Sequence, residues 1–442
     1  MSTHVSSSRV RLVRVITLVL ATLLPIGLAA PAQADAGRPG DESVTGWAQR
    51  HAEPLDTSDP SAPLTDLRHL RRSVGDARIV GLGEGVHGAA EITGLKHRMV
   101  RYLVQDLGFR SIAWEEDWSL GVKINRYVRT GKGDLASLIG RMSTAWRTRE
   151  AKDVLVWLRD YNRSHREDVQ FVGVEAYATR PLAYDAVEEY VAQKAPERLA
   201  ETREHLEVVH PRTEDMEAYV RWYFREVKDK TPYIQHARAL HDLVAGLPHQ
   251  RGDSEYATVL HHTRQIVGFY EQFAAENIFA YRDAHAAENL RWWRRFSGDK
   301  IVYWAASGHT ANAPTLSLTQ PQYPDTEFAS VGSFLRTWFG RDYLSVGFTF
   351  DRGATISEGQ VAQMPAAAPD WLEAPFADVD VDQFTLDLRA KASRPVRDWL
   401  RSPTRTRGVP EGGHGSYLSG GTPAEWFDVI VHRQVVTAAH PG

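Results

Sequence analysis

The chain has 442 residues, no cysteine and a formal net charge of -4. The mild acidity gives no electrostatic basis for nucleic-acid binding, and the lack of cysteine excludes thiolate nucleophiles and Cys-ligated metal sites. The length is sufficient for one α/β core with a large helical insertion, or for two closely joined domains.

Residues 1–34 have the layout of a secretory signal peptide. A segment with three arginines precedes an apolar run from Val15 to Ala30, and Ala32-Gln33-Ala34 forms a cleavage site. The apolar run is short for a membrane span, and no later segment reaches the roughly 20 apolar residues that a span requires. We therefore expect a secreted, extracellular protein with no membrane partner after cleavage. Residues 35–62, rich in Gly, Pro, Ser and Asp, are expected to form a flexible leader before a domain at 63–442.

The elements of that domain alternate in the manner of an α/β fold with a mostly parallel sheet and flanking helices. Hydrophobic periodicity predicts, in chain order, a helix at 64–74, a strand at 78–83, a helix at 89–107, a strand at 111–114, helices at 120–128 and 154–162, and a strand at 169–174. The charged segment at 181–297 predicts a large helical insertion that covers the cleft at the strand ends. Strands return at 300–305, 343–350, 384–388 and 427–431, while the Gly-rich stretch at 412–421 is expected to be a surface loop.

Polar side chains follow several predicted strands at the point where each strand ends. The Gly-rich turn after the strand at 78–83 carries Glu84 and His87, and the later strands lead into Glu115 with Glu116, Glu175, and Ser307 with His309. Each has a simple structural interpretation as a cap or a loop residue. Because the carboxyl ends of parallel strands meet at one edge of a sheet, however, we expect these side chains to form a site there.

The residue types in this cluster are suited to hydrolysis by general-base catalysis. A histidine oriented by a carboxylate can take a proton from water, and a cationic or N–H donor can stabilise the oxyanion that forms at a carbonyl. The chain has no Gly-x-Ser-x-Gly elbow and no His-Glu-x-x-His motif. Glu84, His87, Glu115 and His309 could instead hold a divalent cation, so a metal-dependent hydrolase or peptidase stays open. A binding protein that keeps the cleft without catalysis is a further alternative.

The stretch Gly83-Glu84-Gly85-Val86-His87-Gly88-Ala89-Ala90-Glu91 resembles the erythromycin esterase family, whose opening motif has the form Gly-Glu-x-x-His-Gly-x-x-Glu. The resemblance extends over residues 65–435 in consistent order. It continues through Ile112-Ala113-Trp114-Glu115, Asn125-Arg126-Tyr127-Val128, Trp157-Leu158-Arg159-Asp160-Tyr161-Asn162, Arg282-Asp283, Val302-Tyr303-Trp304-Ala305 with His309, and Leu344-Ser345-Val346-Gly347.

The resemblance implies hydrolysis of a macrolide lactone, or of a related small-molecule ester, without a covalent acyl-enzyme and without a cofactor. Antibiotic detoxification is the role that follows. By the same resemblance, the catalytic residues are His87 as general base, Glu84 and Glu115 as its carboxylate partners, and Arg282 with His309 as groups that polarise the substrate. Glu91, Lys96, Glu175 and Ser307 are expected to bind substrate. The chain departs from the family where it has Ser307-Gly308-His309 in place of Asn-Ala-His, and Glu175 where Asp is common.

Overall fold

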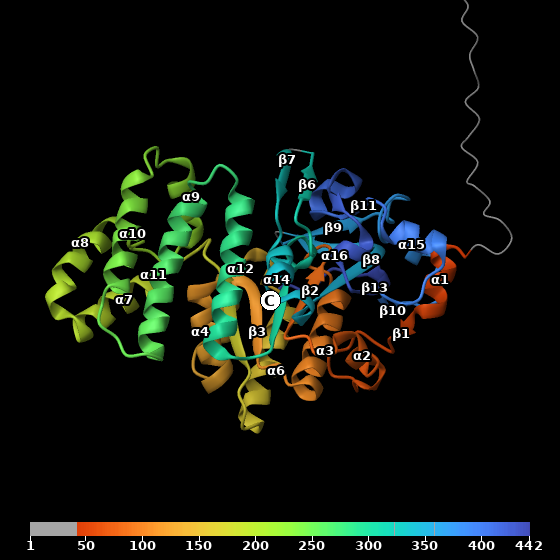
Figure 1. Cartoon of the computed structure of the whole chain (residues 1–442), viewed down its shortest axis with the longest axis horizontal. Coiled ribbons are helices and arrows are strands. Elements are labelled where there is room, and N and C mark those ends of the chain that lie inside the picture. Colours follow the sequence, from red (N-terminus) through yellow and green to blue (C-terminus); the bar gives the residue numbers. More distant parts are fainter. Residues whose placement is uncertain (1–41, 322, 358) are drawn as a thin grey trace, which may run out of the picture. The chain divides into compact units, whose positions relative to one another are not determined.

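Two β-sheets and the helices around them make up the described part of the chain, which the computed structural model gives for residues 42–321, 323–357 and 359–442 (Figure 1). The expected signal peptide and residues 35–41 of the expected leader lie outside these residues. Glu42–Gly442 belong to one compact unit. Among the described helices, none combines the length and the apolar character needed to cross a bilayer.

The main sheet has nine strands in the described residues and is parallel through its centre. Its order is β1-β10-β13-β8-β2-β5-β3-β4, with β9 beside β8. The pairs from β13 to β4 are parallel, whereas β1, β10 and β9 pair antiparallel. The strands are β1 (Glu53–Pro54), β2 (Ile79–Glu84), β3 (Ser111–Asp117), β4 (Gln170–Glu175), β5 (Ile301–Ala306), β8 (Tyr343–Ser357), β9 (Gln360–Met364), β10 (Gln383–Asp387) and β13 (Val429–Val436). The predicted α/β fold with a mostly parallel sheet is therefore confirmed.

Helices cover both faces of this sheet, which explains why its central strands are apolar on both sides. The helices are α1 (Val44–His51), α2 (Leu70–Val74), α3 (Ala90–Leu107), α4 (Trp118–Thr130), α5 (Leu135–Arg141), α6 (Arg149–Ser164), α7 (Pro181–Lys194), α8 (Leu199–Val209), α9 (Met216–Arg225), α10 (Thr231–Ala245), α11 (Ser254–Gln272), α12 (Ile278–Ser297), α13 (Ser307–Thr310), α14 (Val331–Phe339), α15 (Arg394–Leu400) and α16 (Pro423–Trp426). Leu82 and Trp304 pack with α3, α4 and α6 on one face, while Ile79 and Tyr303 pack with α12 and α14 on the other.

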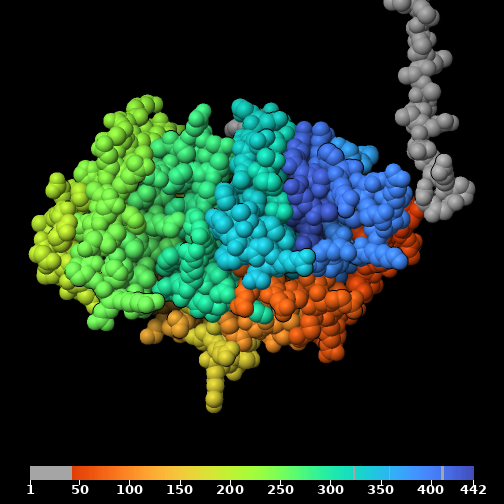
Figure 2. Space-filling model, viewed as in Figure 1, coloured from red at the N-terminus to blue at the C-terminus, as the bar shows by residue number. Residues whose placement is uncertain are grey.

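Residues 181–297 are helical from α7 to α12, in agreement with the predicted insertion. Helices α7 to α11 enclose a separate apolar core with Tyr184, Tyr223, Ile266 and Phe269 at its centre. Helix α12 returns the chain to the sheet and packs beside α14. In Figure 2 the green surface of the insertion borders the cyan surface of the segment that follows β5.

The expected flexible leader is wrong for residues 42–62. Helix α1 lies within this stretch, and Ser43 caps it by accepting a hydrogen bond from Gly46 N. Trp47 is fully buried against the cluster that contains Phe384, and β1 pairs with β10. One buried tryptophan thus ties a segment of loop-like composition to the fold. The predicted helix at 64–74 is also shorter, because a turn of 3-10 helix at Thr65–Leu67 precedes α2.

A second sheet, of order β11-β12-β6-β7, did not follow from the sequence. Its strands are β6 (Leu316–Gln320), β7 (Tyr323–Phe328), β11 (Thr404–Arg407) and β12 (Tyr417–Gly421). The expected surface loop at 412–421 is therefore wrong over β12, which pairs antiparallel with β6 and β11. These strands are short and polar, and β12 ends in two glycines, so their local pattern is that of a loop.

Candidate active site

The turn between β2 and α3 places Glu84 and His87 side by side. His87 Nδ1 lies 2.8 Å from Glu84 Oε1. The turn closes at Gly88, whose φ of 81° is left-handed and whose missing Cβ would collide with the carbonyl oxygen of Ile356. Only glycine satisfies both conditions, so the sequence Gly-Val-His-Gly is explained by the backbone path as well as by the chemistry.

Lys96 lies behind this pair, on α3. Its Nζ forms an ion pair with Glu84 Oε2, donates to the backbone carbonyl of Ala305 at 3.3 Å and lies 4.3 Å from the centroid of a Trp304 ring. The Lys96 side chain is buried. The expectation that it binds substrate is therefore corrected: Lys96 contacts and positions Glu84 from the inner side, and burial lowers the pKa of Lys96 well below its usual range.

His87 remains within reach of a ligand, since 29% of its side chain is exposed. The ring packs edge-on against Trp146 with centroids 4.6 Å apart. Burial lowers the pKa of His87; the charge of Glu115 opposes this effect, while His309 and Arg282 add to it. His87 is then neutral near pH 7. If Nδ1–H donates to Glu84, Nε2 carries the free lone pair that a general base requires.

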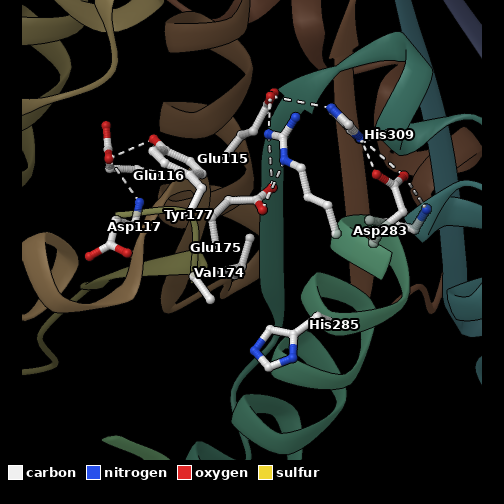
Figure 3. A network of polar contacts seen from close by, with 12 residues as sticks. Glu115, Glu116, Asp117, Val174, Glu175, Tyr177, Asp283, His285 and His309 are labelled. Carbon is white, nitrogen blue, oxygen red and sulfur yellow. Dashed lines mark hydrogen bonds and ion pairs between the residues drawn. The ribbon is translucent and has the colours of Figure 1, made fainter. Parts of the chain in front are cut away.

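Three charged side chains, from β3, β4 and α12, meet near the carboxyl ends of β3 and β4 (Figure 3). Arg282 Nη2 lies 2.7 Å from Glu115 Oε1, and its Nε and Nη2 lie 3.0 and 3.1 Å from the two oxygens of Glu175. Burial lowers the pKa of Arg282, but the charges of Glu175 and Glu115 outweigh this effect. The pKa of Arg282 therefore lies well above its usual range. Arg282 is thus a fixed cation, with 18% of its side chain exposed.

His309, in the short helix α13, completes this group. Its Nδ1 lies 2.8 and 3.0 Å from the two Asp283 oxygens, and its Nε2 lies 3.3 Å from Glu115 Oε1. Burial lowers the pKa of His309, but Asp283 and Glu115 outweigh it and raise the pKa to about 10. His309 and Arg282 in turn hold the pKa of Glu115 well below its usual range, against the effect of burial. The site therefore contains an imidazolium and a neutral imidazole in different environments.

Ser307 and Glu91 do not join this group as substrate ligands. The Ser307 hydroxyl is buried and donates to the Gly83 carbonyl at 2.9 Å, which ties β2 to α13. Glu91 accepts hydrogen bonds from the Thr437 N–H and hydroxyl at 2.7 and 2.9 Å. Each side chain is engaged in holding the fold, so these contacts give no support to the expectation that it binds substrate. Glu175 is brought into the site, but its contact is the ion pair with Arg282.

Sequence reasoning missed two residues that shape the site. Asp283, the residue after Arg282, is buried against His309 and also accepts from Val331 N at 3.0 Å. Tyr177, just after β4, places its ring 5.8 Å from the Arg282 guanidinium. The only sequence signal for Tyr177 as a site residue is its position two residues after Glu175.

A cavity of 680 Å³ adjoins this group at Tyr177. Its walls come from the loop after α5, from the segment after β4 and from α9 and α11 of the insertion; they include Met142, Arg180, Met216, Val220 and Phe273. Such a mixed apolar and polar lining is typical of a small-molecule site.

The alternative metal site is not favoured by the side-chain grouping. Within the described part of the chain, no three His, Asp or Glu side chains are arranged as a ligand set. Glu84 and Glu115 instead face Lys96 and Arg282, and both His309 nitrogens face carboxylates. The donor atoms that would hold a cation are thus directed at protein cations.

A neutral histidine beside fixed cations, at the strand ends of a parallel sheet, is a site for acid–base chemistry on a polar substrate. The comparisons with known proteins agree. The family model for erythromycin esterase matches residues 104–436, and the chain belongs to the erythromycin esterase family. Membership of this family indicates a hydrolase.

Individual relatives are distant. The erythromycin esterase type II of Escherichia coli is 24% identical over 354 residues, which cover 70% of this chain and 78% of that protein. A crystal structure of a Bacillus cereus protein superposes with a TM-score of 0.77 at 26% identity, covering 90% of this chain and 98% of the other. An erythromycin esterase mutant in its open conformation superposes with a TM-score of 0.68 at 19% identity, covering 87% and 97%. The last similarity concerns the fold alone.

Proposed function

We propose that this protein opens a macrolide lactone, or cleaves a related ester, with water activated by His87 and without a metal or other cofactor. The observation that carries the proposal is the pairing of His87 with Glu84 through Nδ1, which leaves Nε2 free on a partly exposed neutral ring. Family membership and the erythromycin esterase activity for which the Escherichia coli relative is named support the substrate class.

In this mechanism His87 Nε2 takes a proton from water while the water oxygen bonds to the carbonyl carbon. The carbonyl oxygen becomes an oxyanion. The carbon–oxygen bond of the ester then breaks, and the leaving alkoxide takes the proton back from His87. Glu84 stabilises the transient imidazolium, and Lys96 holds Glu84 in place. General-base catalysis of this kind contributes about 10²- to 10⁴-fold.

Arg282 is better placed than His309 to donate to the oxyanion. Its Nε and Nη2 make the ion pairs with Glu115 and Glu175, so Nη1 is available to a substrate. Both nitrogens of His309 face carboxylates. We assign His309 the role of holding Glu115, and with it Arg282, in place.

We also propose that the protein acts outside the cell, where removal of the antibiotic lowers the amount that enters. The signal-peptide layout of residues 1–34 supports this part of the proposal. Detection of a mature chain that begins after Ala34 in the culture medium would test it, and an intact N-terminus retained in the cell fraction would contradict it.

The catalytic proposal is tested by mass spectrometry of erythromycin incubated with the mature protein. The expected result is a product heavier by one water with wild type and with His165→Asn, an exposed control, and none with His87→Asn. A chelated wild-type sample should behave as the untreated one. Loss of product on chelation would favour a metal-dependent hydrolase, and saturable binding without product would favour a non-catalytic ligand-binding homologue.

A further inference from the structure

Glu116 directly follows Glu115 on β3, but its carboxylate faces a different set of groups. The side chain is buried. Oε1 accepts hydrogen bonds from Asp117 N and from the Tyr177 hydroxyl, each at 2.8 Å, and Oε2 accepts from Ser143 N at 2.8 Å. Figure 3 shows Tyr177 pointing at Glu116 from the segment after β4. Three donors from three parts of the chain therefore converge on one carboxylate.

Two of these donors belong to segments that flank the catalytic groups. Ser143 immediately precedes a turn of 3-10 helix at Thr144–Trp146. Trp146 from that turn donates its Nε1–H to the backbone carbonyl of Glu115 at 2.9 Å, and its ring packs on His87. On the other side, the Tyr177 ring faces the Arg282 guanidinium. Glu116 thus connects the neighbour of His87 with the neighbour of Arg282.

The same residues contribute to the wall of the cavity. Glu116, Ser143 and Tyr177 all line it, while Met216 and Phe273 line it from the helical insertion. Tyr177 links the cavity to the site, because it lines the cavity and its ring also lies beside the Arg282 guanidinium. The hydrogen bonds of Glu116 hold the Tyr177 hydroxyl directly, and they hold the Trp146 turn through Ser143 N.

We propose that Glu116 is a positioning residue: it fixes the Trp146 turn and Tyr177 on either side of the site, and so determines how open His87 and Arg282 are toward the cavity. The importance of Glu116 for turnover rests on the proposed esterase function. Its effect on the exposure of His87 is independent of that function.

A carboxylate is required because both oxygens face donors only. In Glu116→Gln, the one remaining side-chain oxygen can still accept from Asp117 N and the Tyr177 hydroxyl. The amide NH₂ then faces Ser143 N–H, and two donors cannot form a hydrogen bond with each other. The variant therefore loses the bond to the Trp146 turn and retains the others. Ser143→Pro removes the same bond from the opposite side, since proline lacks the N–H. The backbone accepts it, because Ser143 has a φ of -51° and Met142 is extended.

The test is the rate at which diethyl pyrocarbonate modifies His87, followed by peptide mass mapping of the folded protein at a pH where His87 is neutral. Above the pKa of about 7 that burial gives Glu116, the lost hydrogen bond is one to a charged group, and its loss shifts a local opening equilibrium by about tenfold or more. Because His87 is already partly exposed, we expect its labelling to rise by a smaller factor, about two- to tenfold, in Glu116→Gln and in Ser143→Pro. Asp299→Asn should label as wild type. Asp299 is the matched control, because its carboxylate accepts from Ser111 and Gln170 near the start of the strands.

A wild-type labelling rate in either loop variant would overturn the proposal, and so would an equal increase in Asp299→Asn, which would indicate general loosening. Where a hydrolysed ester is in hand, Glu116→Gln should raise KM more than it lowers kcat, because His87 and Arg282 keep their own ion partners. Equal losses in kcat with unchanged KM would contradict the assignment. Failure of the esterase proposal itself would appear separately, as absence of product from wild type with the labelling pattern intact.

Discussion

Replacement of Asp283 by Asn gives a direct test of the charge arrangement in the site. The substitution keeps the shape of the side chain, and its oxygen can still accept from Val331 N. It removes the largest contribution that raises the pKa of His309. We expect the His309 pKa to fall toward its ordinary value, so that the ring loses its proton closer to neutral pH.

The size and the sign of the effect follow from the linkage between protonation and folding. The pKa of His309 is raised from 6.5 to about 10 in the folded protein. A group of this kind stabilises the fold fully below pH 6.5, and the stabilisation is lost as the pH rises toward about 10. The total is at most about 5 kcal/mol, of which removal of Asp283 should eliminate about 2–3 kcal/mol.

The assay is urea unfolding of wild type and Asp283→Asn across this pH range, followed by tryptophan fluorescence. The difference in free energy of unfolding between the two proteins should be largest near pH 6.5 and shrink toward pH 10. Asp299→Asn serves as the control, since its carboxylate accepts from Ser111 and Gln170 rather than from a histidine. A difference that does not change with pH would refute the assignment of His309 as a charged partner of Asp283.

Three further predictions concern His87 and its supports. His87→Asn should lower kcat by about 10²- to 10⁴-fold with little change in the urea midpoint, because the ring makes one side-chain hydrogen bond; a near-wild-type rate would eliminate the general-base role. The pH–rate profile of wild type should fall on the acid side only below pH 6.5, because the pKa of His87 is lowered; an acid limb centred above pH 7 would contradict this direction. Lys96→Met should destabilise the fold by about 3–5 kcal/mol, since it leaves Glu84 buried without its cation; equilibrium unfolding measures this, and Lys300→Met at a half-buried lysine is the comparison.

Much of the fold follows from the sequence because its signals are local. The apolar runs at β2, β3 and β5 and the long helical periodicity of 181–297 can be read without knowing what they contact. The convergence of Glu84, Glu115 and His309 also follows, once the strands are taken as parallel, because such strands end at one edge of the sheet. The pairing of His87 with Glu84 needs only the short turn that separates them.

Other features depend on contacts between distant segments, and only the tertiary structure decided them. Helix α1 and the second sheet form because Trp47 and the short polar strands find partners hundreds of residues away or across a hairpin, and no local pattern encodes such pairing. The same holds for side-chain roles. Lys96 and Ser307 follow site motifs in the sequence, but their side chains contact Glu84 and the Gly83 carbonyl. The buried Asp283 holds the imidazolium of His309, and the buried Glu116 holds Tyr177 and the Trp146 turn beside the site. The sequence determined which chemistry could gather at the sheet edge, whereas the packing of distant segments determined which of those side chains face a substrate and which ones hold them there.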